Sequence, residues 1–449
     1  MSSGEDEYQD TLDFIEARSN YARGFISSPS SRTGGPELGL TRSRALLDAL
    51  GSPDRANPIV HIAGSKGKGS TGAFAAAIGQ AAGYRTGLST SPHLHSFRER
   101  IAIDGAPISR SDFARIGGTT QVAAESLERD RPELGAVTAF ELLTAMALLT
   151  FADAGCELAV VEVGLGGTFD ATNVVTPAVS VITRLDLEHT QVLGETLVEI
   201  AENKAGIIKP GVPAVTAWQE PEALEVIEQT AHARGAPLQV VGRDFHWTGN
   251  WRGFSWSNDT HRIDRLRTSL SGNHQAENAA LAIAVWETLA GIGLTASDEA
   301  IRQGLETASL PGRFERVEAD GRTWILDGAH TPVSAAALAD ALLAEFGHPV
   351  GVIAGLLRDK HPTPFFAALA PAIAGLIVTA PQNPRAVSAD ELILTASAAN
   401  SQTIARKDLE TALLTARAYF PTSLPIVITG SFTLVAEARE RFGLALVDR

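Results

Sequence analysis

The sequence predicts an α/β protein with two domains, and three observations lead to this fold class. The chain has 449 residues, which suits two or three domains of ordinary size. Short apolar runs without polar alternation are followed by helical patterns, as is typical of parallel strands covered on both faces. This pattern is interrupted once and then restarts. We therefore expect a larger N-terminal domain over residues 1–309 and a smaller, Rossmann-like α/β domain over residues 310–449.

The N-terminal domain is expected to contain a mostly parallel sheet with helical crossovers. Its buried strands are expected within NPIVHIAG (57–64), RTGLST (85–90), LAVVEVG (158–164) and AVSVITRLD (178–186). Residues 238–270 differ, because aromatic and polar residues nearly alternate there and turn residues separate them. This region predicts antiparallel hairpins attached to the first domain. Helical sequence returns over residues 273–293.

The joint between the domains is expected at ASLPGRFERV (308–317), where Pro311 and Gly312 break the helical pattern, and the strand–helix pattern restarts after it. The strands of the C-terminal domain are expected within WILDGAH (324–330), PVGVIAGL (349–356), GLIVTAP (375–381) and LPIVITGS (424–431), with helices between them. Ligands of such sheets gather at the carboxyl ends of the strands. The residues at those ends are Asp327, His330, Thr379 and Ser431.

The charge and composition exclude several classes of partner. The formal net charge is −15, so nucleic acid and anionic membrane surfaces would be repelled. The longest apolar stretch (365–380) is broken by Pro371 and Gly375 and is shorter than the roughly 20 residues that span a bilayer. The acidic N-terminus lacks the apolar core of a signal peptide, and a single cysteine, Cys156, excludes a disulfide within the chain. We expect a cytoplasmic protein in which Cys156 is a small buried residue.

Residues 61–74, HIAGSKGKGSTGAF, form a glycine-rich loop between an apolar run and an alanine-rich helix. The standard phosphate-binding loop is G-x-x-x-x-G-K-[ST], but Ile62 occupies the position of its first glycine. The shorter form G-x-x-G-K-G-S keeps the same physics, since glycines let the backbone approach an anion and the helix directs its N-terminus at it. The nucleotide-binding residues predicted here are Gly64, Ser65, Lys66, Gly67, Lys68, Gly69 and Ser70.

This loop predicts a P-loop-type domain that binds a nucleoside triphosphate. Lys68 is expected to neutralise the β- and γ-phosphates, and the Ser70 hydroxyl is expected to bind Mg²⁺. The alternative is a glycine-rich turn whose lysines are solvated. The order of strand, loop and helix favours the nucleotide.

Two ionisable residues stand where apolar side chains are expected. Glu162 follows a buried strand, where a carboxylate is costly unless it is paired, metal-bound or held by the N–H groups of the glycines that follow. Lys204 shares one helix face with Leu197, Ile200 and Ile208. Burial would lower its pKa and yield a neutral amine that can take up CO₂ to form a carbamate. The alternative is a lysine whose head reaches solvent along an apolar surface.

Seven further segments resemble those of one family. They are LSTSPHLHSFRERIAIDGAPIS (88–109), VVEVGLGGTFDATNVV (160–175), LDLEHTQVLGETLVEIAENKAGIIKPG (185–211), NHQAENAALAIA (273–284), PGRFERV (311–317), LDGAHTP (326–332) and TGSFTLVAEAR (429–439). These segments resemble motifs of the folylpolyglutamate synthases and dihydrofolate synthases of the Mur ligase family. They occur in the same order as in that family, and the resemblance runs from about residue 40 to residue 440.

The resemblance implies an ATP-dependent ligase that forms an amide. In this family a substrate carboxylate attacks the γ-phosphate of ATP to give an acyl phosphate, and the amine of L-glutamate then displaces phosphate. The carboxylate would belong to a reduced folate such as tetrahydrofolate, or to dihydropteroate. The implied cofactors are ATP and two Mg²⁺ ions. We expect a monomer, because the cleft is completed within one chain.

The resemblance also implies a set of magnesium ligands. Ser91, Glu162 and His189 match the family's metal-binding positions, and Lys204 matches a lysine that is carbamylated beside a magnesium site. For Ser91 the alternative is a turn hydroxyl before Pro92. For His189 the alternative is a hydrogen-bonding histidine near the helix expected to begin around residue 195.

Four other residues match positions at the nucleotide and at the second substrate. Asn278 resembles the residue near adenine, with an ordinary helix-surface amide as the alternative, and Arg313 matches an arginine that reaches the ATP phosphates. Asp327 and His330 match residues that face the cleft. Either is a candidate acceptor for the proton that the glutamate ammonium must lose.

Three positions depart from the family pattern. Lys66 stands where asparagine is usual, Glu188 where aspartate is frequent, and Thr331 where asparagine is common. These departures leave the detailed nucleotide and amine contacts open, but not the class.

Two other functions are compatible with parts of this pattern. One is a sister ligase for another carboxylate and amino acid, against which the SPHL and EVGLGG segments argue. The other is a catalytically silent nucleotide-binding protein, against which the joint presence of Lys68, Ser70, Glu162, His189 and Lys204 argues. The sequence leaves open whether the first glutamate, later ones or both are added.

Overall fold

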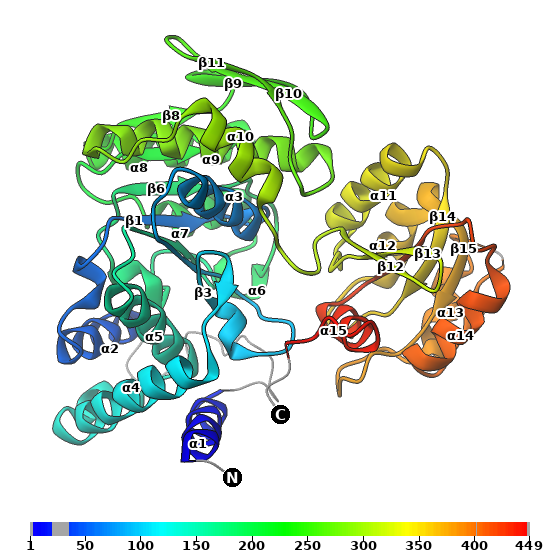
Figure 1. Ribbon diagram of the computed structural model, residues 1–449, viewed down its shortest axis with the longest axis horizontal. Helices are drawn as coiled ribbons and strands as arrows, with labels where there is room; N and C mark the ends of the chain where they lie inside the picture. Colours follow the sequence, from blue (N-terminus) through cyan, green and yellow to red (C-terminus); the bar gives the residue numbers. More distant parts are fainter. Residues whose placement is uncertain (1–2, 20–35, 401, 447–449) are drawn as a thin grey trace.

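The chain folds into two α/β lobes joined by a connection near residue 310 (Figure 1). In this computed structural model the described residues are 3–19, 36–400 and 402–446. The larger lobe contains an 8-stranded sheet with the order β4-β3-β2-β5-β1-β6-β7-β8. The strands are β1 (Ile59–Ala63), β2 (Thr86–Ser89), β3 (Ile101–Ile103), β4 (Ala106–Pro107), β5 (Leu158–Glu162), β6 (Val179–Ile182), β7 (Ala214–Thr216) and β8 (Leu238–Val240).

The middle of this sheet is parallel, and its β3–β4 edge is antiparallel. All residues of β1, β5 and β6 are buried, as expected for apolar strands covered on both faces. Alternate residues of β1 face opposite cores, since Val60 and Ile62 belong to one apolar cluster and Ile59 to another. The glycine-rich loop therefore leaves the sheet at its centre, directly after β1.

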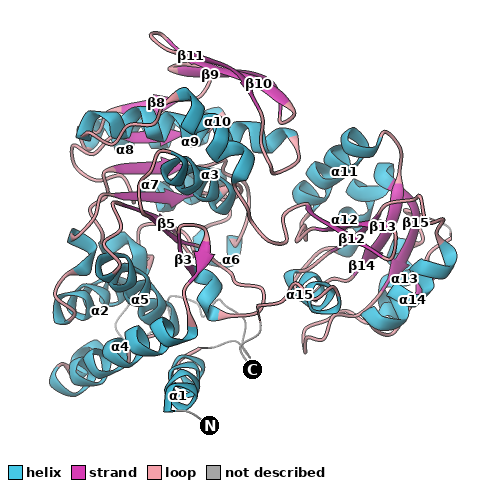
Figure 2. Cartoon of the chain, in the orientation of Figure 1, coloured by secondary structure: helices cyan, strands magenta, loops and turns pink. Residues whose placement is uncertain are grey.

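Helices cover both faces of this sheet (Figure 2). They are α1 (Ser3–Ala17), α2 (Pro36–Ala49), α3 (Lys68–Ala81), α4 (Arg110–Asp130), α5 (Ala139–Asp153), α6 (Thr190–Leu193), α7 (Leu197–Ala205), α8 (Pro221–Ala233), α9 (Asn273–Leu289) and α10 (Asp298–Thr307). Helix α3 is rich in alanine and glycine and so packs closely on its neighbours. The Trp286 indole of α9 donates to the Ala75 carbonyl at 2.9 Å, and Gly304 of α10 lies against the Ile78 backbone.

The predicted hairpin region is confirmed in most of its length. Strands β9 (Phe245–Asn250), β10 (Gly253–Asn258) and β11 (Arg262–Leu266) form a three-stranded antiparallel sheet. The buried Trp256 anchors it by donating to the Ala280 carbonyl of α9 at 3.2 Å. Residues 238–240, however, form β8 and extend the parallel sheet beside β7.

The smaller lobe has a 6-stranded sheet with the order β12-β13-β17-β14-β15-β16, antiparallel only between β12 and β13. Its strands are β12 (Glu315–Ala319), β13 (Arg322–Leu326), β14 (Val350–Ala354), β15 (Ile373–Val378), β16 (Ile404–Ala405) and β17 (Ile426–Thr429). Its helices are α11 (Pro332–Phe346), α12 (Pro362–Leu369), α13 (Ala389–Ala396), α14 (Leu409–Tyr419) and α15 (Phe432–Arg441). The predicted α/β fold class with mostly parallel sheets is confirmed in both lobes.

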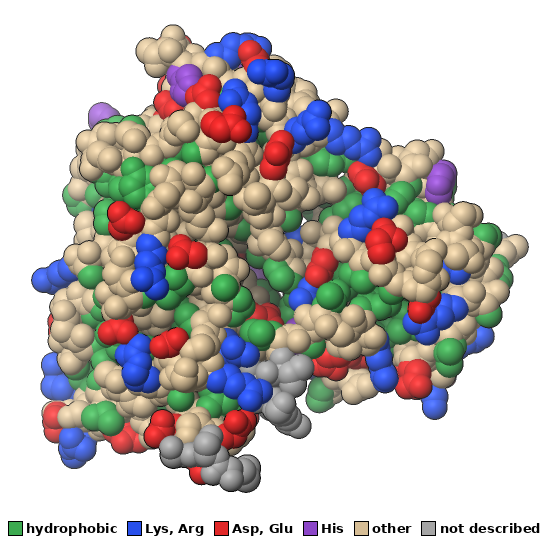
Figure 3. Space-filling view, in the orientation of Figure 1, with side chains coloured by type: hydrophobic (Ala, Val, Ile, Leu, Met, Phe, Trp, Pro, Cys, Tyr) green, Lys and Arg blue, Asp and Glu red, His purple; other side chains and the backbone are tan. Residues whose placement is uncertain are grey.

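The lobes touch at a few points and leave a hollow between them (Figure 3). His95 of the larger lobe lies 3.0 Å from the Ala436 carbonyl of α15, and Leu94 packs on the core beneath that helix. Arg252 of the hairpin sheet pairs with Glu345 of α11 at 2.7 Å. Cys156 is buried, as predicted. Over the described residues, the helices lack the combination of length and apolar character that crossing a membrane requires.

Candidate active site

The glycine-rich loop joins β1 to α3, and two of its glycines are required by close packing. Gly64 has φ 151°, and a Cβ atom there would overlap the Thr183 hydroxyl. Gly67 has φ 90°, and a Cβ atom there would overlap the Asn278 amide oxygen. Only glycine accepts both this backbone conformation and this approach. The loop is thus pressed between β6 and α9.

The first N–H groups of the loop are engaged in hydrogen bonds within the protein. The amides of Ser65 and Lys66 both donate to the Arg184 carbonyl at 3.0 Å, and the Ser65 hydroxyl donates to the Asp186 carbonyl at 3.0 Å. Helix α3 begins at Lys68. The N–H groups at the start of a helix lack partners within it and attract anions. The anion-binding end of the loop is therefore the start of α3.

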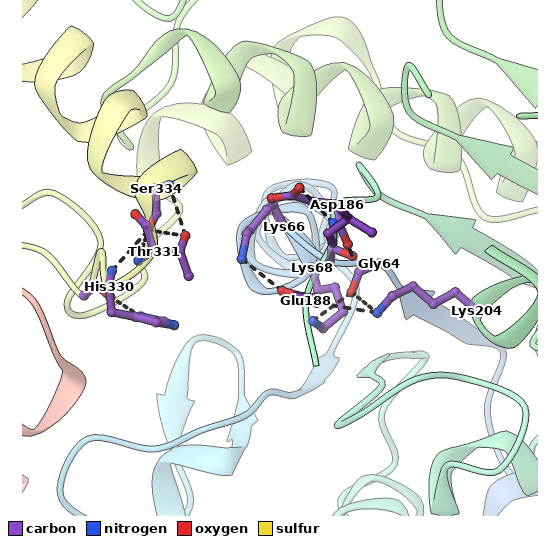
Figure 4. A network of polar contacts seen from close by, with 12 residues as sticks. Gly64, Lys66, Lys68, Asp186, Glu188, Lys204, His330, Thr331 and Ser334 are labelled. Carbon is purple, nitrogen blue, oxygen red and sulfur yellow. Dashed lines mark hydrogen bonds and ion pairs between the residues drawn. The ribbon is translucent and has the colours of Figure 1, made fainter. Parts of the chain in front are cut away.

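Two lysine ammonium groups share the Gly64 carbonyl (Figure 4). Lys68 donates to it at 3.1 Å and Lys204 donates to it at 2.8 Å. The Lys204 side chain is only 2% exposed, so the alternative of a head in solvent is wrong. Burial, together with the charge of Lys68, lowers the pKa of Lys204 to about 7. This shift favours the neutral amine. Helix α7 ends at Ala205, so the apolar face expected to run on to Ile208 stops short of it.

Glu188 lies between two of the lysines. One carboxylate oxygen accepts from Lys66 at 2.9 Å, and the other lies 3.6 Å from Lys204 (Figure 4). Burial alone would raise the pKa of Glu188, but Lys66, Lys68 and Lys204 outweigh it and lower the pKa to about 2. The carboxylate is ionised throughout the physiological range.

Glu162, at the end of β5, faces the same loop. Its side chain is 7% exposed and accepts a hydrogen bond from the Ser91 amide at 3.0 Å, with Lys68 at 3.9 Å. Burial raises the pKa of Glu162, and the charge of Lys68 opposes that shift. The N–H that reaches this carboxylate thus belongs to Ser91, not to the glycines after β5. Ser91 and Glu162 are brought together, as the metal-ligand prediction requires.

His189 begins the short helix α6 in a left-handed conformation, with φ 51°. Desolvation lowers its pKa, and Lys204, Lys360 and Lys68 add to that effect while Glu188 opposes it. A lowered pKa favours the neutral imidazole, which is the form that binds a metal. Lys360 belongs to the smaller lobe, so His189 faces the hollow between the lobes.

The predicted residues of the smaller lobe form a second group. The Asp327 carboxylate accepts from the amides of Phe314 at 2.8 Å and Ala329 at 2.9 Å. The Arg313 guanidinium lies 4.3 Å from the centre of the Phe432 ring. Burial raises the pKa of Asp327, and Arg313 opposes that shift. Burial lowers the pKa of Arg313, and the charges of Asp327 and Glu162 oppose that shift. Because Glu162 belongs to the larger lobe, Arg313 faces the loop across the hollow.

His330 has one ring nitrogen engaged. Its Nδ1 lies 2.7 Å from the Gly328 carbonyl, which can only accept, so Nδ1 carries the proton and Nε2 keeps its lone pair. Burial lowers the pKa of His330 to about 4. Thr331, one of the three departures, caps α11 by accepting from the Ser334 amide at 3.2 Å.

Asn278 is buried, so the alternative of a helix-surface amide is wrong. Its amide nitrogen donates to Gln275 at 3.0 Å, and its oxygen lies against Gly67. Arg184 and Trp218 lie beside the loop and were not predicted as site residues. The Arg184 guanidinium lies 4.9 Å from the centre of the half-exposed Trp218 ring. Lys360 was also missed, although it follows β14 at the ligand-binding edge of the sheet.

These features define an ATP-dependent ligase of the Mur type: a phosphate-binding loop at the centre of a parallel sheet, facing a second α/β lobe. Two family models match the chain, the Mur ligase middle domain over residues 111–286 and the Mur ligase glutamate ligase domain over residues 312–432.

The chain belongs to the folylpolyglutamate synthase and dihydrofolate synthase family of Mur ligases. It is 38% identical to the dihydrofolate synthase/folylpolyglutamate synthase of Bacillus subtilis, over 79% of this chain and 80% of that protein. It is 36% identical to the Mycobacterium tuberculosis enzyme of the same name, over 90% of each.

Solved structures agree with this assignment. The M. tuberculosis folylpolyglutamate synthase complexed with ADP and AMPPCP matches with a TM-score of 0.85 and 33% identity, over 98% of this chain and 99% of that one. A complex of folylpolyglutamate synthase (FPGS) with AMPPCP and folate matches with a TM-score of 0.80 and 32% identity, over 97% of this chain and 99% of that one. Both of these relatives were solved in complex with AMPPCP, which is an ATP analogue.

Proposed function

We propose that this chain is an ATP-dependent ligase that joins L-glutamate to a folate, or to dihydropteroate, through an acyl phosphate. The single observation that carries the proposal is the cluster of Lys68, Glu162, His189 and Lys204 around the glycine-rich loop, in a chain of this family. Phosphoryl transfer depends mostly on positioning and on neutralising charge, and this cluster supplies both.

The phosphates of ATP are proposed to bind at the start of α3. Residues 64–70 supply the anion-binding end, and Lys68 leaves the Gly64 carbonyl to neutralise the β- and γ-phosphates. Arg313 of the smaller lobe is proposed to approach the same phosphates from across the hollow, and Asn278 to lie near the adenine. Closure of the lobes would exclude water that otherwise hydrolyses the acyl phosphate.

Two magnesium ions are proposed, with Ser70, Ser91, Glu162 and His189 as protein ligands. Within residues 3–19, 36–400 and 402–446, no group of three or more His, Cys, Asp or Glu side chains could hold a metal ion. The proposed set contains one carboxylate, Glu162, and magnesium takes one or two protein carboxylates and completes its shell with phosphates and water. When bound, the ions would offset phosphate charge.

Lys204 is proposed to carry a carbamate. The amine nitrogen would bond to the carbon of CO₂ and release one proton. Its burial, its pKa of about 7 and its place beside the loop support this reaction. Incubation with ¹³CO₂ is expected to give a carbamate carbon resonance in wild-type protein that is lost in Lys204→Arg.

The glutamate ammonium must lose a proton before it attacks. Of the two candidates, His330 is better placed, because its Nε2 keeps a lone pair whereas both oxygens of Asp327 accept backbone N–H groups. Lys360 is proposed to bind a carboxylate of glutamate, since its charge reaches both His189 and His330.

We also propose that the domains meet between residues 309 and 310, next to the breakers Pro311 and Gly312. The separate family matches, which end at 286 and begin at 312, support this boundary. A monomeric state and a cytoplasmic location stay predictions, and light scattering of the purified protein tests the first.

The function is tested by phosphate release with ATP, Mg²⁺ and L-glutamate, comparing dihydropteroate with tetrahydrofolate and identifying products by mass spectrometry. Release that depends on dihydropteroate assigns the first glutamate, and release with tetrahydrofolate assigns chain extension. Binding of AMPPCP without product from either substrate contradicts the folate assignment and favours a sister ligase. Absence of any ATP turnover with a panel of carboxylates and amino acids favours the silent nucleotide-binding protein.

A further inference from the structure

Two of the three departures from the family pattern contact each other. Lys66 and Glu188 are 122 positions apart, yet the Lys66 ammonium donates to the Glu188 carboxylate at 2.9 Å. The sequence does not predict this pair, because the two residues belong to separate motifs. The contact joins the phosphate-binding loop to the turn that carries His189.

Both ends of this contact are held by other interactions. The Lys66 backbone is fixed by its amide, which donates to the Arg184 carbonyl at 3.0 Å. Glu188 is held on its other oxygen by Lys204 at 3.6 Å. The side chains of Lys66, Glu188 and Lys204 are 29%, 14% and 2% exposed, so the contact runs from the rim of the hollow into its wall.

The charges around Glu188 make its position matter. Before a carbamate forms on Lys204, the amino groups of three lysines lie near this carboxylate, and Glu188 contacts those of Lys66 and Lys204 (Figure 4). Without Lys66, the carboxylate keeps only its longer contact to Lys204 and can turn toward solvent. Since His189 directly follows Glu188, the turn would then lose the side-chain contact nearest to His189 and keep the loop's contacts to the Arg184 and Asp186 carbonyls.

We propose that Lys66 is a positioning residue: its ion pair with Glu188 holds the loop (64–70) and the His189 turn as one preformed unit before the nucleotide arrives. A site assembled in advance spares the bound state the cost of ordering it, so the pair raises nucleotide affinity without requiring Lys66 to touch phosphate. This inference rests on the proposed nucleotide function of the loop.

The test is a double-mutant cycle on the full-length protein with Lys66→Met, Glu188→Gln and both changes together. Isothermal titration with AMPPCP and Mg²⁺ measures affinity. Each single variant is expected to weaken binding roughly 5- to 50-fold, which lies within the range of couplings in one salt-bridge network, and the double variant no more than the worse single. Lys66→Arg is expected to restore affinity to within about 3-fold, since it keeps the charge.

The matched control is the Arg18–Glu128 pair, which is 3.2 Å long and 19% and 24% exposed, and which ties α4 to the end of α1. Arg18→Met and Glu128→Gln are expected to leave AMPPCP affinity unchanged.

Two outcomes would overturn the proposal. If the loss of affinity in the double variant equals the product of the two single losses, the residues act independently. Tighter binding in Glu188→Gln would show that Lys66 is a direct phosphate ligand that Glu188 holds back.

Hydrogen exchange of ligand-free protein gives a second readout, independent of nucleotide. Lys66→Met is expected to speed exchange over residues 186–193, and unchanged exchange there contradicts the proposed tie. Failure of wild-type protein to bind AMPPCP would instead contradict the proposed function.

Discussion

The two lobes build their halves of the site with different interactions. In the larger lobe, charged side chains contact one another and one shared carbonyl, as in the set Lys66, Lys68, Glu162, Glu188 and Lys204. In the smaller lobe, Lys360 pairs with Asp359 at 3.0 Å, but the two charged residues nearest the loop contact backbone groups and an aromatic ring. Asp327 accepts two amides, and Arg313 lies over Phe432.

This difference indicates that the halves fail in different ways. A network of ionised groups in a poorly solvated place is sensitive to the loss of any one charge, because its partners are left uncompensated. Groups anchored to backbone are sensitive to shape, since their orientation is set by turns and packing. Four predictions test this contrast, from the largest expected effect to the smallest.

Lys68→Ala tests the charged half. It removes the ammonium nearest Glu162 and the start of α3, and kcat/KM is expected to fall roughly 10²- to 10³-fold, the usual effect of losing one charge-stabilising donor. Phosphate release under saturating ATP measures it. The control is Lys407→Ala, because Lys407 is 83% exposed in the smaller lobe. A loss below 5-fold in Lys68→Ala would show that the network tolerates the loss of this charge.

Asp327→Asn tests the backbone-anchored half. The amide keeps the shape but supplies one acceptor oxygen where two amides donate, and it removes the charge beside Arg313. We expect kcat to fall roughly 10- to 100-fold, as when one partner of a buried charge pair is removed. The pH–rate profile is expected to keep its form. Loss of one limb of that profile would instead identify Asp327 as the proton acceptor for glutamate.

Phe432→Leu sharpens the contrast, because it changes packing and no charge. Arg313 loses the ring 4.3 Å away, an interaction worth about 0.5–2 kcal/mol. The KM for ATP is expected to rise several-fold while the melting temperature changes little. An unchanged KM would mean that Arg313 is positioned by Asp327 alone.

His95 lies at the contact between the halves and predicts a small pH effect. Burial lowers its pKa, but the Glu99 carboxylate and the Ala436 carbonyl outweigh it, and the net pKa is raised although Arg439 opposes them. A raised pKa means that the contribution to stability is complete below the unfolded value near 6.5 and is lost as pH rises through the folded value. The stability difference between wild type and His95→Phe is therefore expected to be larger at pH 5.5 than at pH 8.5. Chemical unfolding at both pH values measures this difference. Equal differences would show that the pKa of His95 is the same in the folded and unfolded states.

Much of the fold followed from local pattern. The apolar runs at β1, β5 and β6 predicted a parallel sheet because strands covered on both faces need no polar alternation. Residues 238–240 were assigned to the hairpins because three residues carry too little pattern to separate one sheet from the next. The edge strands β4 and β16, of two residues each, were not predicted for the same reason.

The candidate site divided along a similar line. The burial of Lys204 was predictable from helix periodicity, because its neighbours at i−4 and i−7 are apolar. The pairing of Lys66 with Glu188 was not, since it depends on how two segments 122 residues apart meet in space. Lys360 does not belong to any of the recognised motifs and was not predicted. It follows a buried strand, however, and that position alone could have marked it as a candidate site residue.

The Gly64 carbonyl oxygen receives lysines from two segments of the chain, 4 and 140 positions away. Its location depends on the absence of a side chain at residue 64, where the Thr183 hydroxyl already fills the space. One substitution at this glycine would therefore displace two cations at once. In a library of random variants, no other residue is expected to be tolerated at position 64, whereas Thr183→Ser is expected to be tolerated because it keeps the hydroxyl that donates to the Ala63 carbonyl at 3.3 Å.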